Sequence, residues 1–248
     1  MKKKHILVVG GTKGIGHVIA KEFAKDSATV SVIGRSRPMR PTSKKGEIHY
    51  FLADIADKKK REQTITTIIK RNGKLNAVVF SQRVRDAKDN WQAELDITLG
   101  ATKEIIDQVS NHFVEGNDKS IVIVNSVANS FVIPGQSLGY HVAKAGLVQL
   151  ARFLAVTLGP KGIRINCVSP ATVLKDEARE FYKKEKTLLR LFGDVIPLGR
   201  MGTPLDIYHL VAFLCSDKSL YITGQNITID GGYYLLSPES LTRKYTKK

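Results

Sequence analysis

Short apolar runs alternate with longer amphipathic segments along most of this chain. Nearly continuous apolar character is typical of parallel strands that are buried on both faces of a sheet. We expect strands at 6–9, 29–33, 48–52, 77–80, 121–125, 164–168 and 226–229, and helices at 14–25, 58–71, 92–113, 136–159 and 204–215. The alternation predicts an α/β fold, a doubly wound parallel sheet of about seven strands with helices on both faces. In such sheets, ligands bind beyond the carboxyl ends of the strands.

The length of 248 residues suits one α/β domain with a full core, and the chain shows neither an internal repeat nor a low-complexity linker. We expect the domain to span 1–236, with the least patterned segment, 172–200, as a lid. A polar, basic tail is expected at 237–248. No run approaches the roughly 18 apolar residues that a membrane span needs, so no membrane partner is expected.

The amino terminus and the cysteines favour a cytoplasmic location. The apolar run after the lysines at 2–4 is too short for a signal peptide and leads into glycines, so we interpret it as the first strand. Cys167 and Cys215 both lie in apolar runs, which favours core positions over a disulfide and suits a reducing compartment.

The chain carries a large positive excess, 39 Lys and Arg against 23 Asp and Glu, for a net charge of +16. Such an excess attracts polyanions. The lysines are spread over the whole sequence, without the aromatic platforms or the zinc pattern of many nucleic-acid-binding modules. We therefore expect attraction for a phosphorylated ligand, with nucleic-acid binding as the minor alternative and no metal site.

A glycine-rich turn at 10–16, Gly-Gly-Thr-Lys-Gly-Ile-Gly, follows the first predicted strand and leads into a predicted helix. Glycines suit such a turn because it needs unusual backbone angles, and because side chains would keep a phosphate away from the amides at the helix N-terminus. The pattern differs from the common dinucleotide fingerprint, but its position between strand and helix indicates a cofactor site.

Ser126 precedes Tyr140 by fourteen residues, and Lys144 follows four residues later in the sequence Tyr-His-Val-Ala-Lys. On a helix, residues four apart are neighbours on one face, so the phenol and the ammonium would share one site. A nearby cation favours the phenolate and lowers the pKa of a tyrosine. The spacing suits an acid/base catalyst, although a Tyr and a Lys four apart on a helix are more often a half-buried ring beside a solvated amine, so the rest of the sequence has to decide between the two.

The glycine-rich turn together with these three residues resembles the short-chain dehydrogenase/reductase family, over nearly the whole chain. Further matching positions are Asp54, Asn166, the run 197–206 and the ending 221–233. The resemblance implies a Rossmann-type fold that binds NAD or NADP and moves hydride between the nicotinamide and a carbonyl or alcohol carbon. It also implies a homotetramer or a dimer.

The family's catalytic roles are transferred onto the matching positions. Tyr140 would donate the proton to the nascent alkoxide, Ser126 would hold the carbonyl oxygen, and Lys144 would bind the nicotinamide ribose and lower the Tyr140 pKa. Asp54 would hold the adenine amino group. Cofactor contacts are implied for Gly11, Thr12, Lys13, Gly14, Ile15, Gly16, Arg35, Ser36, Asp54, Ser81, Tyr140, Lys144, Pro170 and Val173.

The chain departs from the family pattern at two places. The segment 80–83 reads Phe-Ser-Gln-Arg where the family usually has Asn-Asn-Ala-Gly beside the adenine. Thr98 lies where the family usually has an asparagine that relays protons to the lysine through water. We expect an altered or weaker proton relay, and a relative with a non-redox, regulatory or structural role stays open as the alternative.

The residues after the second predicted strand favour NADP(H) over NAD(H). NAD specificity generally needs an acidic residue there, whereas the sequence gives Gly-Arg-Ser-Arg at 34–37. Arg35 can form a forked contact with a 2′-phosphate, Ser36 can donate a further hydrogen bond, and Lys13 adds a second positive charge. Arg37 is not counted among the residues that bind the 2′-phosphate, because the following Pro38 can turn its side chain away.

The substrate is expected to be a small carbonyl or alcohol compound. The lid mixes leucines and aromatic residues with many lysines, which suits either an amphipathic helix packed on its own core or a wall for an acyl or aromatic substrate. The sequence is most similar to 3-oxoacyl-carrier-protein reductases, and a basic surface suits an acidic carrier protein. A ketoreductase acting on a carrier-protein-bound substrate is the function this resemblance implies.

Overall fold

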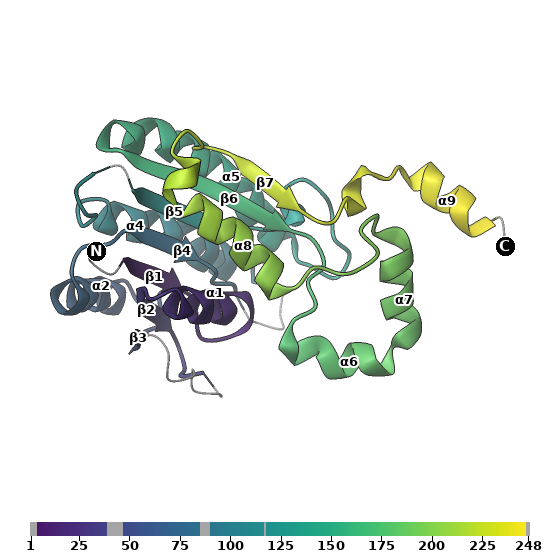
Figure 1. Cartoon of the computed structure of the whole chain (residues 1–248), viewed down its shortest axis with the longest axis horizontal. Coiled ribbons are helices and arrows are strands. Elements are labelled where there is room, and N and C mark those ends of the chain that lie inside the picture. Colours follow the sequence, from purple (N-terminus) through teal and green to yellow (C-terminus); the bar gives the residue numbers. More distant parts are fainter. Residues whose placement is uncertain (1–3, 39–46, 85–89, 117, 247–248) are drawn as a thin grey trace.

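The computed structural model describes residues 4–38, 47–84, 90–116 and 118–246. In this part of the chain, seven parallel strands form one sheet in the order β3-β2-β1-β4-β5-β6-β7 (Figure 1). The strands are β1 His5–Val9, β2 Thr29–Gly34, β3 Glu47–Leu52, β4 Ala77–Phe80, β5 Lys119–Val124, β6 Ile163–Pro170 and β7 Asn226–Ile229. The predicted fold class is confirmed, and each predicted strand begins and ends within two residues of its observed bounds.

Helices cover both faces of the sheet (Figure 1). The helices α1 Gly14–Lys25 and α8 Pro204–Leu214 pack on one face. The helices α2 Lys58–Asn72, α4 Ala101–Val109 and α5 Leu138–Leu158 pack on the other. Short 3₁₀ turns complete the connections: η2 Val127–Asn129, η3 Gly159–Lys161, η4 Asp176–Ala178, η5 Asp217–Ser219 and η6 Tyr233–Leu235.

Strand β1 shows why the apolar runs are nearly continuous. Leu7 and Val9 pack into the core under α2, α4 and α5, whereas Ile6 and Val8 pack under α1 and α8. Successive side chains of a strand point to opposite faces, so a strand covered on both faces needs an apolar residue at every position. Each such side chain contributes roughly 1.5–3 kcal/mol through burial.

The chain order reverses beside β1. The chain runs from β1 outward to β2 and β3, then returns to place β4 on the other side of β1. The loops that leave β1 and β4 therefore diverge, and a crevice opens between them at the carboxyl ends of the strands. This crevice positions the candidate site.

The helix expected at 92–113 is confirmed as a helical segment from Trp91 to Val109, but it is not α-helical throughout. The segment begins with α3 Trp91–Ala93, passes through a π-helical turn, η1 Glu94–Gly100, and continues as α4. Buried polar side chains, Glu94 and Thr98, lie on the π turn. Such turns are frequent at functional sites, and the sequence pattern did not reveal this one.

The lid and the tail contain helices that the sequence interpretation did not place. Within 172–200 the structure has α6 Arg179–Lys184 and α7 Lys186–Val195, which extend away from the sheet at the right of Figure 1. The expected polar tail contains α9 Pro238–Thr246, whose turns are supported by an Arg243–Glu239 ion pair four residues apart. The tail is thus polar as expected, but it is helical over most of its length.

One helical segment, Leu138–Lys161, is long and apolar enough by length and composition to cross a membrane. The expectation that no run approaches this length was therefore wrong. The segment contains α5, which packs against the sheet through Leu147, Ala151 and Leu154. The core helix of a protein passes the same test, so this finding carries little weight for a membrane span.

Candidate active site

A cavity of about 840 Å³ opens at the carboxyl ends of the strands. Its walls include the residues that follow β1, β2, β3, β4 and β5 and the end of β6. One lining residue from each of these places is, in this order, Gly10, Arg35, Asp54, Ser81, Ser126 and Pro170. The location agrees with the crevice that the strand order creates.

The glycine-rich turn forms one wall, and its backbone is tightly enclosed. Gly10 has a φ of +81°, and a Cβ there would lie 2.5 Å from the backbone nitrogen of Gln82. A side chain at Gly16 would lie 2.5 Å from the carbonyl oxygen of Gly10. Glycine is therefore required at both positions by close backbone approach, as expected from the sequence.

The amide at the N-terminus of α1 already binds an anion from within the chain. The backbone N–H of Gly14 donates a hydrogen bond to Oε1 of Glu177 at 3.1 Å. Glu177 and Lys175, both from the base of the lid, line the cavity there. A carboxylate oxygen thus occupies the position in which the sequence predicts a phosphate oxygen.

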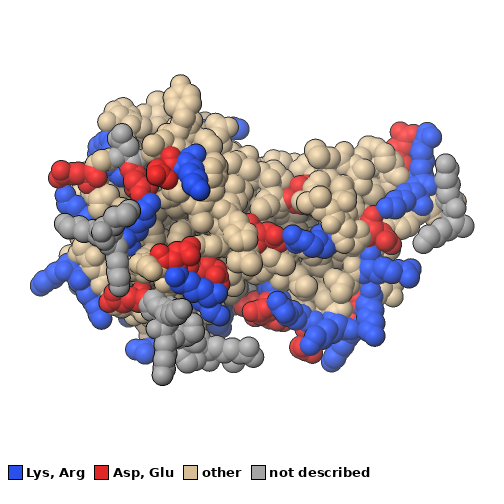
Figure 2. All heavy atoms as spheres, in the orientation of Figure 1, with Lys and Arg blue, Asp and Glu red and all other residues tan. Residues whose placement is uncertain are grey.

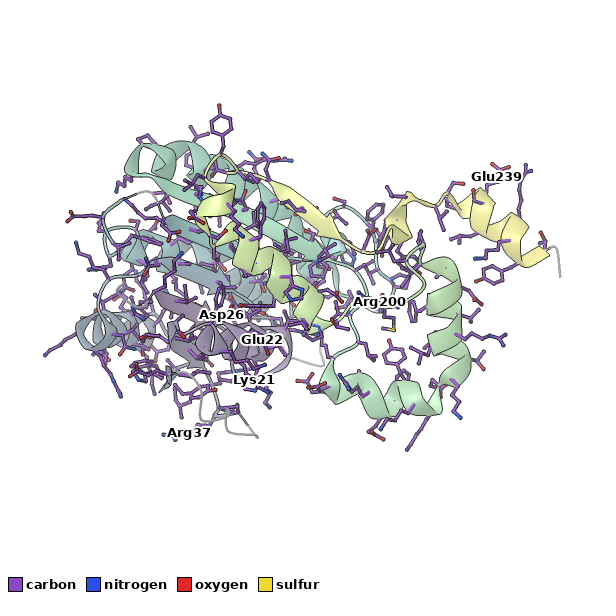
Figure 3. The ribbon with its side chains drawn as sticks, in the orientation of Figure 1. Lys21, Glu22, Asp26, Arg37, Arg200 and Glu239 are labelled. Carbon is purple, nitrogen blue, oxygen red and sulfur yellow. The ribbon has the colours of Figure 1, made fainter. Side chains whose placement is uncertain are left out.

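Cationic and hydroxyl groups line the far end of the cavity. Lys13, Arg35, Ser36 and Asp54 all contribute to its lining. Arg37 does not line it, and Figure 3 shows this side chain at the outer edge of the molecule, beyond β2. The structure therefore brings Arg35 and Ser36 together with Lys13, and it supports the decision to set Arg37 aside.

Ser126 leaves the end of β5 and begins η2. Its Oγ accepts a hydrogen bond from the backbone N–H of Ala128 at 3.2 Å. Asn129, at the end of the same turn, is held in a closed set of hydrogen bonds with Ser169 and Asn226, at 2.6–3.2 Å. This set joins the turn to β6 and β7, so it fixes where Ser126 points.

Tyr140 lies in the first turn of α5, with the helix N-cap Ser137 accepting a hydrogen bond from its backbone N–H at 3.1 Å. Burial raises the pKa of Tyr140, while a hydrogen bond with the Ser126 side chain acts in the opposite direction. The expectation of a lowered Tyr140 pKa is wrong for this structure, because desolvation of the phenolate outweighs the favourable contacts.

Lys144 is 3% exposed, and its Nζ donates a hydrogen bond to the carbonyl oxygen of Val124 at 3.4 Å. The Nζ also lies 5.6 Å from the centroid of the Tyr140 ring. Burial lowers the pKa of Lys144 to about 8, and Glu94 acts against this shift. Tyr140, Lys144 and Ser126 therefore share one buried corner of the cavity, as the spacing predicts.

The two departures from the family pattern are connected by hydrogen bonds. Nε2 of Gln82 donates to Oγ1 of Thr102 at 2.6 Å, and this hydroxyl donates to the carbonyl oxygen of Thr98 at 2.7 Å. The Thr98 hydroxyl in turn donates to Oε2 of Glu94 at 2.7 Å. Gln82 thus belongs to a polar chain that runs from the cavity wall into the π turn.

Most of the expected site residues line the cavity, and three do not. Gly11 and Gly16 pack behind the turn, and Thr98 is 1% exposed with its hydroxyl directed to Glu94. The expected residues that do line it are Thr12, Lys13, Gly14, Ile15, Arg35, Ser36, Asp54, Ser81, Ser126, Tyr140, Lys144, Pro170 and Val173.

The sequence interpretation missed several residues that shape the site. Glu94 supports the π turn through a hydrogen bond within it, whereas Thr102 and Asn129 make hydrogen bonds to segments 20 and 40 residues away in the chain. Glu177 and Lys175 also went unnoticed, although two charged residues shortly after Pro170 were a visible signal. Among the described residues, no group of His, Cys, Asp or Glu could hold a metal ion.

Arg200 marks the point where the lid returns to the body of the protein (Figure 3). Its guanidinium donates to both carboxylate oxygens of Asp206, at 2.8 and 2.9 Å. Asp206 also forms a capping box with Thr203 at the start of α8, and these hydrogen bonds hold the Asp206 pKa well below its usual range. The lid thus ends on a well-anchored helix.

Figure 2 shows how charge is distributed over one face of the molecule. Lys and Arg side chains lie around its periphery, with Asp and Glu among them, and the largest group of cations follows the lid and the tail helix. No continuous basic groove is visible on this face among the described residues. The view therefore gives no support to the nucleic-acid alternative.

Comparisons with known proteins identify a family model and several relatives. The family model described as enoyl-(acyl carrier protein) reductase matches residues 9–234. The protein named probable 2,4-dienoyl-CoA reductase of Bacillus subtilis is 30% identical, over 95% of this chain and 98% of the relative. A 3-oxoacyl-(acyl-carrier-protein) reductase of Chlamydia muridarum is 29% identical, over 92% of this chain and 96% of the relative.

Solved structures share the fold. The ligand-free aldohexose dehydrogenase of Thermoplasma acidophilum superposes with a TM-score of 0.84 at 23% identity, covering 96% of each chain. The alignment leaves little of either chain uncovered, so the similarity concerns the fold as a whole.

Proposed function

The chain belongs to the short-chain dehydrogenase/reductase family of oxidoreductases, and we propose that it is an NADP(H)-dependent ketoreductase. One observation carries the proposal. Ser126, Tyr140 and Lys144 meet in one buried corner of a cavity that also contains the glycine-rich turn and Arg35. An acid/base group and a dinucleotide cradle in the same cavity are what carbonyl reduction by hydride transfer requires.

The residues present fit a dinucleotide. The Gly14 amide donates to the carboxylate of Glu177, which shows that this helix N-terminus accepts an anionic oxygen. The cavity has a volume of about 840 Å³, and both Arg35 and Tyr140 line it. When bound, the nicotinamide would supply or accept the hydride.

The chain's own side chains would handle charge and protons. The Ser126 hydroxyl would orient the substrate carbonyl by donating a hydrogen bond to its oxygen. The Tyr140 hydroxyl would donate its proton to that oxygen as negative charge develops on it. A pKa raised by burial keeps Tyr140 protonated, and so ready to donate, in the direction of carbonyl reduction. Lys144 would hold the ribose beside the phenol.

Charge at the far end of the cavity supports NADP(H) over NAD(H). Arg35 and Ser36 follow β2, Lys13 of the glycine-rich turn lines the same cavity, and no acidic residue follows β2 at 34–37. A guanidinium can bind a 2′-phosphate through two parallel hydrogen bonds, which a ribose hydroxyl does not match in strength. Asp54 would bind the adenine amino group.

A row of aromatic rings supports an acyl or other apolar substrate. The rings of Phe131 and Tyr234 stack with their centroids 4.2 Å apart. The neighbouring ring of Tyr233 continues the row, and its centroid lies 6.4 Å from that of Phe192 on α7. Tyr182 of α6 then contacts Phe192 at 6.3 Å. The row joins the segment after η2 to the lid and lies outside the residues that line the cavity, so an acyl chain attached to the reacting carbonyl would reach it on leaving the cavity.

A carrier-protein-bound 3-oxoacyl group combines this apolar row with the basic lid. The relative from Chlamydia muridarum is named as a reductase of such a group. The cations of the lid would attract an acidic carrier protein. A homotetramer or a dimer and a cytoplasmic location complete the proposal. Exposed apolar side chains on α5, Phe153 and Val156, supply a surface for the subunit contact.

The test is a steady-state assay of NADPH and NADH consumption by the purified protein over a panel of carbonyl compounds that includes 3-oxoacyl thioesters. We expect turnover with NADPH, faster with 3-oxoacyl thioesters than with simple ketones. NADPH binding without turnover on any carbonyl would overturn the ketoreductase proposal and favour a non-redox role.

A further inference from the structure

We propose that His141 is a positioning residue that holds the segment 130–136 on the start of α5 and so fixes Phe131 at the end of the aromatic row. The inference rests on the proposed function and deepens it, because it names a residue on which the binding of long acyl chains depends. It is carried by two hydrogen bonds of one imidazole ring, one to the segment and one to the N-cap of α5.

The hydrogen bonds of His141 assign the proton of its ring. The backbone N–H of Ile133 donates to Nε2 at 2.9 Å, so Nε2 acts as an acceptor and carries no proton. The ring proton therefore lies on Nδ1, which donates to the carbonyl oxygen of Ser137 at 2.7 Å. Both ring nitrogens are thus engaged, and a side chain with only carbon atoms can make neither contact.

The segment that His141 holds is a tight turn beginning at Ile133. The Ile133 carbonyl oxygen accepts a hydrogen bond from the backbone N–H of Gln136 at 3.1 Å. Pro134 and Gly135 lie between them, and Gly135 has a φ of +82°. Proline followed by glycine at positive φ is typical of a type II turn. His141 therefore ties a well-defined turn to the helix.

This turn lies midway along the connection between Ser126 and Tyr140, seven residues from each. The Ser126 end is held separately, through the hydrogen bonds of Asn129 to β6 and β7. The Tyr140 end is held by Ser137, whose Oγ accepts from the Tyr140 N–H at 3.1 Å. Loss of the His141 ring would therefore release the turn while both catalytic residues keep their own anchors.

Phe131 precedes the turn by two residues and connects it to the aromatic row. Its ring stacks on Tyr234, with the centroids 4.2 Å apart and the planes 28° apart. Phe131 is 42% exposed, so part of its surface is open to a ligand. It does not line the cavity, and only an acyl chain long enough to leave the cavity would reach it. We therefore expect His141 to affect long acyl chains and to leave short ones alone.

Three substitutions of His141 separate its two hydrogen bonds. The side-chain amide of glutamine reaches the position of the ring Nε2, so His141→Gln can still accept from the Ile133 N–H. The shorter amide of asparagine reaches only the position of Nδ1, so His141→Asn can donate to Ser137 but cannot hold the turn. His141→Phe keeps the shape of a ring and makes neither hydrogen bond.

Hydrogen exchange tests the positioning without any need for turnover. Amide exchange in the peptide covering 131–137 is measured by mass spectrometry on the purified, folded proteins. We expect exchange at Ile133 to be about 5- to 10-fold faster in His141→Asn and His141→Phe than in the wild type, and nearly unchanged in His141→Gln. Equal exchange in all four proteins would overturn the proposal. If His141→Phe does not fold, the comparison of asparagine with glutamine decides alone.

Chain-length dependence tests the effect on the substrate. The kcat and KM are measured with NADPH and the N-acetylcysteamine thioesters of 3-oxobutanoate and 3-oxododecanoate. In His141→Asn we expect the KM of the long thioester to rise by about 5- to 10-fold, with its kcat and both constants of the short thioester nearly unchanged. His141→Gln should restore the long-chain KM. An equal fall in kcat for both thioesters would overturn the proposal, because it would place His141 in the chemical step.

Phe131→Leu tests whether His141 acts through the aromatic ring. This substitution should raise the long-chain KM without changing exchange at Ile133, and adding His141→Asn to it should raise the KM little further. Additive effects of the two substitutions would overturn the proposal. His209→Asn, exposed on α8, is the matched control and should change neither exchange in this peptide nor the KM.

The two readouts separate this inference from the proposed function. Faster exchange in His141→Asn, with no turnover of any thioester by the wild type, would support the positioning role and contradict the ketoreductase proposal. Turnover with the same chain-length dependence in every variant would contradict the role of His141 and leave the ketoreductase proposal intact.

Discussion

The side-chain amide of Gln82 donates a hydrogen bond to the hydroxyl of Thr102 across 2.6 Å, and this bond joins the two departures from the family pattern. The Thr102 hydroxyl in turn donates a hydrogen bond to the carbonyl oxygen of Thr98 on the π turn. The segment that replaces the usual small residues beside the adenine is therefore tied to the segment that replaces the usual asparagine.

Thr102→Val tests that connection. The substitution keeps the shape but leaves the Gln82 amide and the Thr98 carbonyl without this partner, which costs about 1–3 kcal/mol. We expect the melting temperature to fall by about 2–4 °C for each kcal/mol. Thr66→Val on α2 is the matched control, because its hydroxyl makes the same bond to a carbonyl four residues back on an exposed face. Equal shifts would show that the buried connection contributes nothing.

Arg35→Ala tests the choice of cofactor. Loss of a charged hydrogen-bond donor at a phosphate should weaken NADPH binding by about 10- to 100-fold, while NADH binding should change little. Isothermal titration calorimetry with both cofactors measures this. Arg37→Ala is the control, because Arg37 lies outside the cavity lining, and it should leave both affinities unchanged. A parallel loss for NADH and NADPH would contradict recognition of the 2′-phosphate by Arg35.

Glu177→Gln tests whether the lid carboxylate competes with the cofactor. Glu177 accepts a hydrogen bond from the Gly14 amide, so a pyrophosphate bound there would displace it and would also be repelled by its charge. We expect the variant to bind NADPH about 3- to 10-fold more tightly. Glu180→Gln, which removes an exposed charge paired with Lys183, should leave the affinity unchanged. Weaker binding in Glu177→Gln would show that the carboxylate assists the cofactor instead.

The buried lysine gives a pH dependence with a definite sign. Lys144 has a pKa of about 8 in the folded chain, against 10.5 for the ordinary side chain, so the unfolded chain binds more protons between these values. The stability contributed by this group therefore rises with pH from about 8 to 10.5. Urea unfolding at pH 7.5 and 9.5 should show the wild type gaining stability relative to Lys144→Met. A constant difference would mean that Lys144 titrates normally.

The sheet and the main helices are predictable from the sequence because each strand is covered on both faces. Strand β4, Ala77–Phe80, is buried at every position, and its apolar run fixes both its bounds and its central place. The π turn η1 is not predictable in this way. It is supported by the Thr98–Glu94 hydrogen bond within the turn and by the close approach of Glu94 to Gly139 on α5, and neither contact has a periodic signal in the sequence.

The candidate site was also predictable from the sequence only in part. Ser126, Tyr140, Lys144 and Arg35 were found because the strand ends and the family spacing bring them to one edge of the sheet. The direction of the Tyr140 pKa shift was not found, because it depends on burial that only the packed structure reveals. Local spacing thus identifies which groups meet, whereas packing decides how they titrate.

Hydride transfer measured directly tests the central claim. The protein is incubated with NADPH deuterated at the transferring position and with a 3-oxoacyl thioester, and the product is examined by mass spectrometry. The account predicts one deuterium at the new carbinol carbon with the wild type. With Tyr140→Phe, it predicts formation of this product slowed by about 10²- to 10⁴-fold, with NADPH binding retained. Bound cofactor without labelled alcohol from any carbonyl compound, or labelled product formed equally fast by Tyr140→Phe, would contradict it.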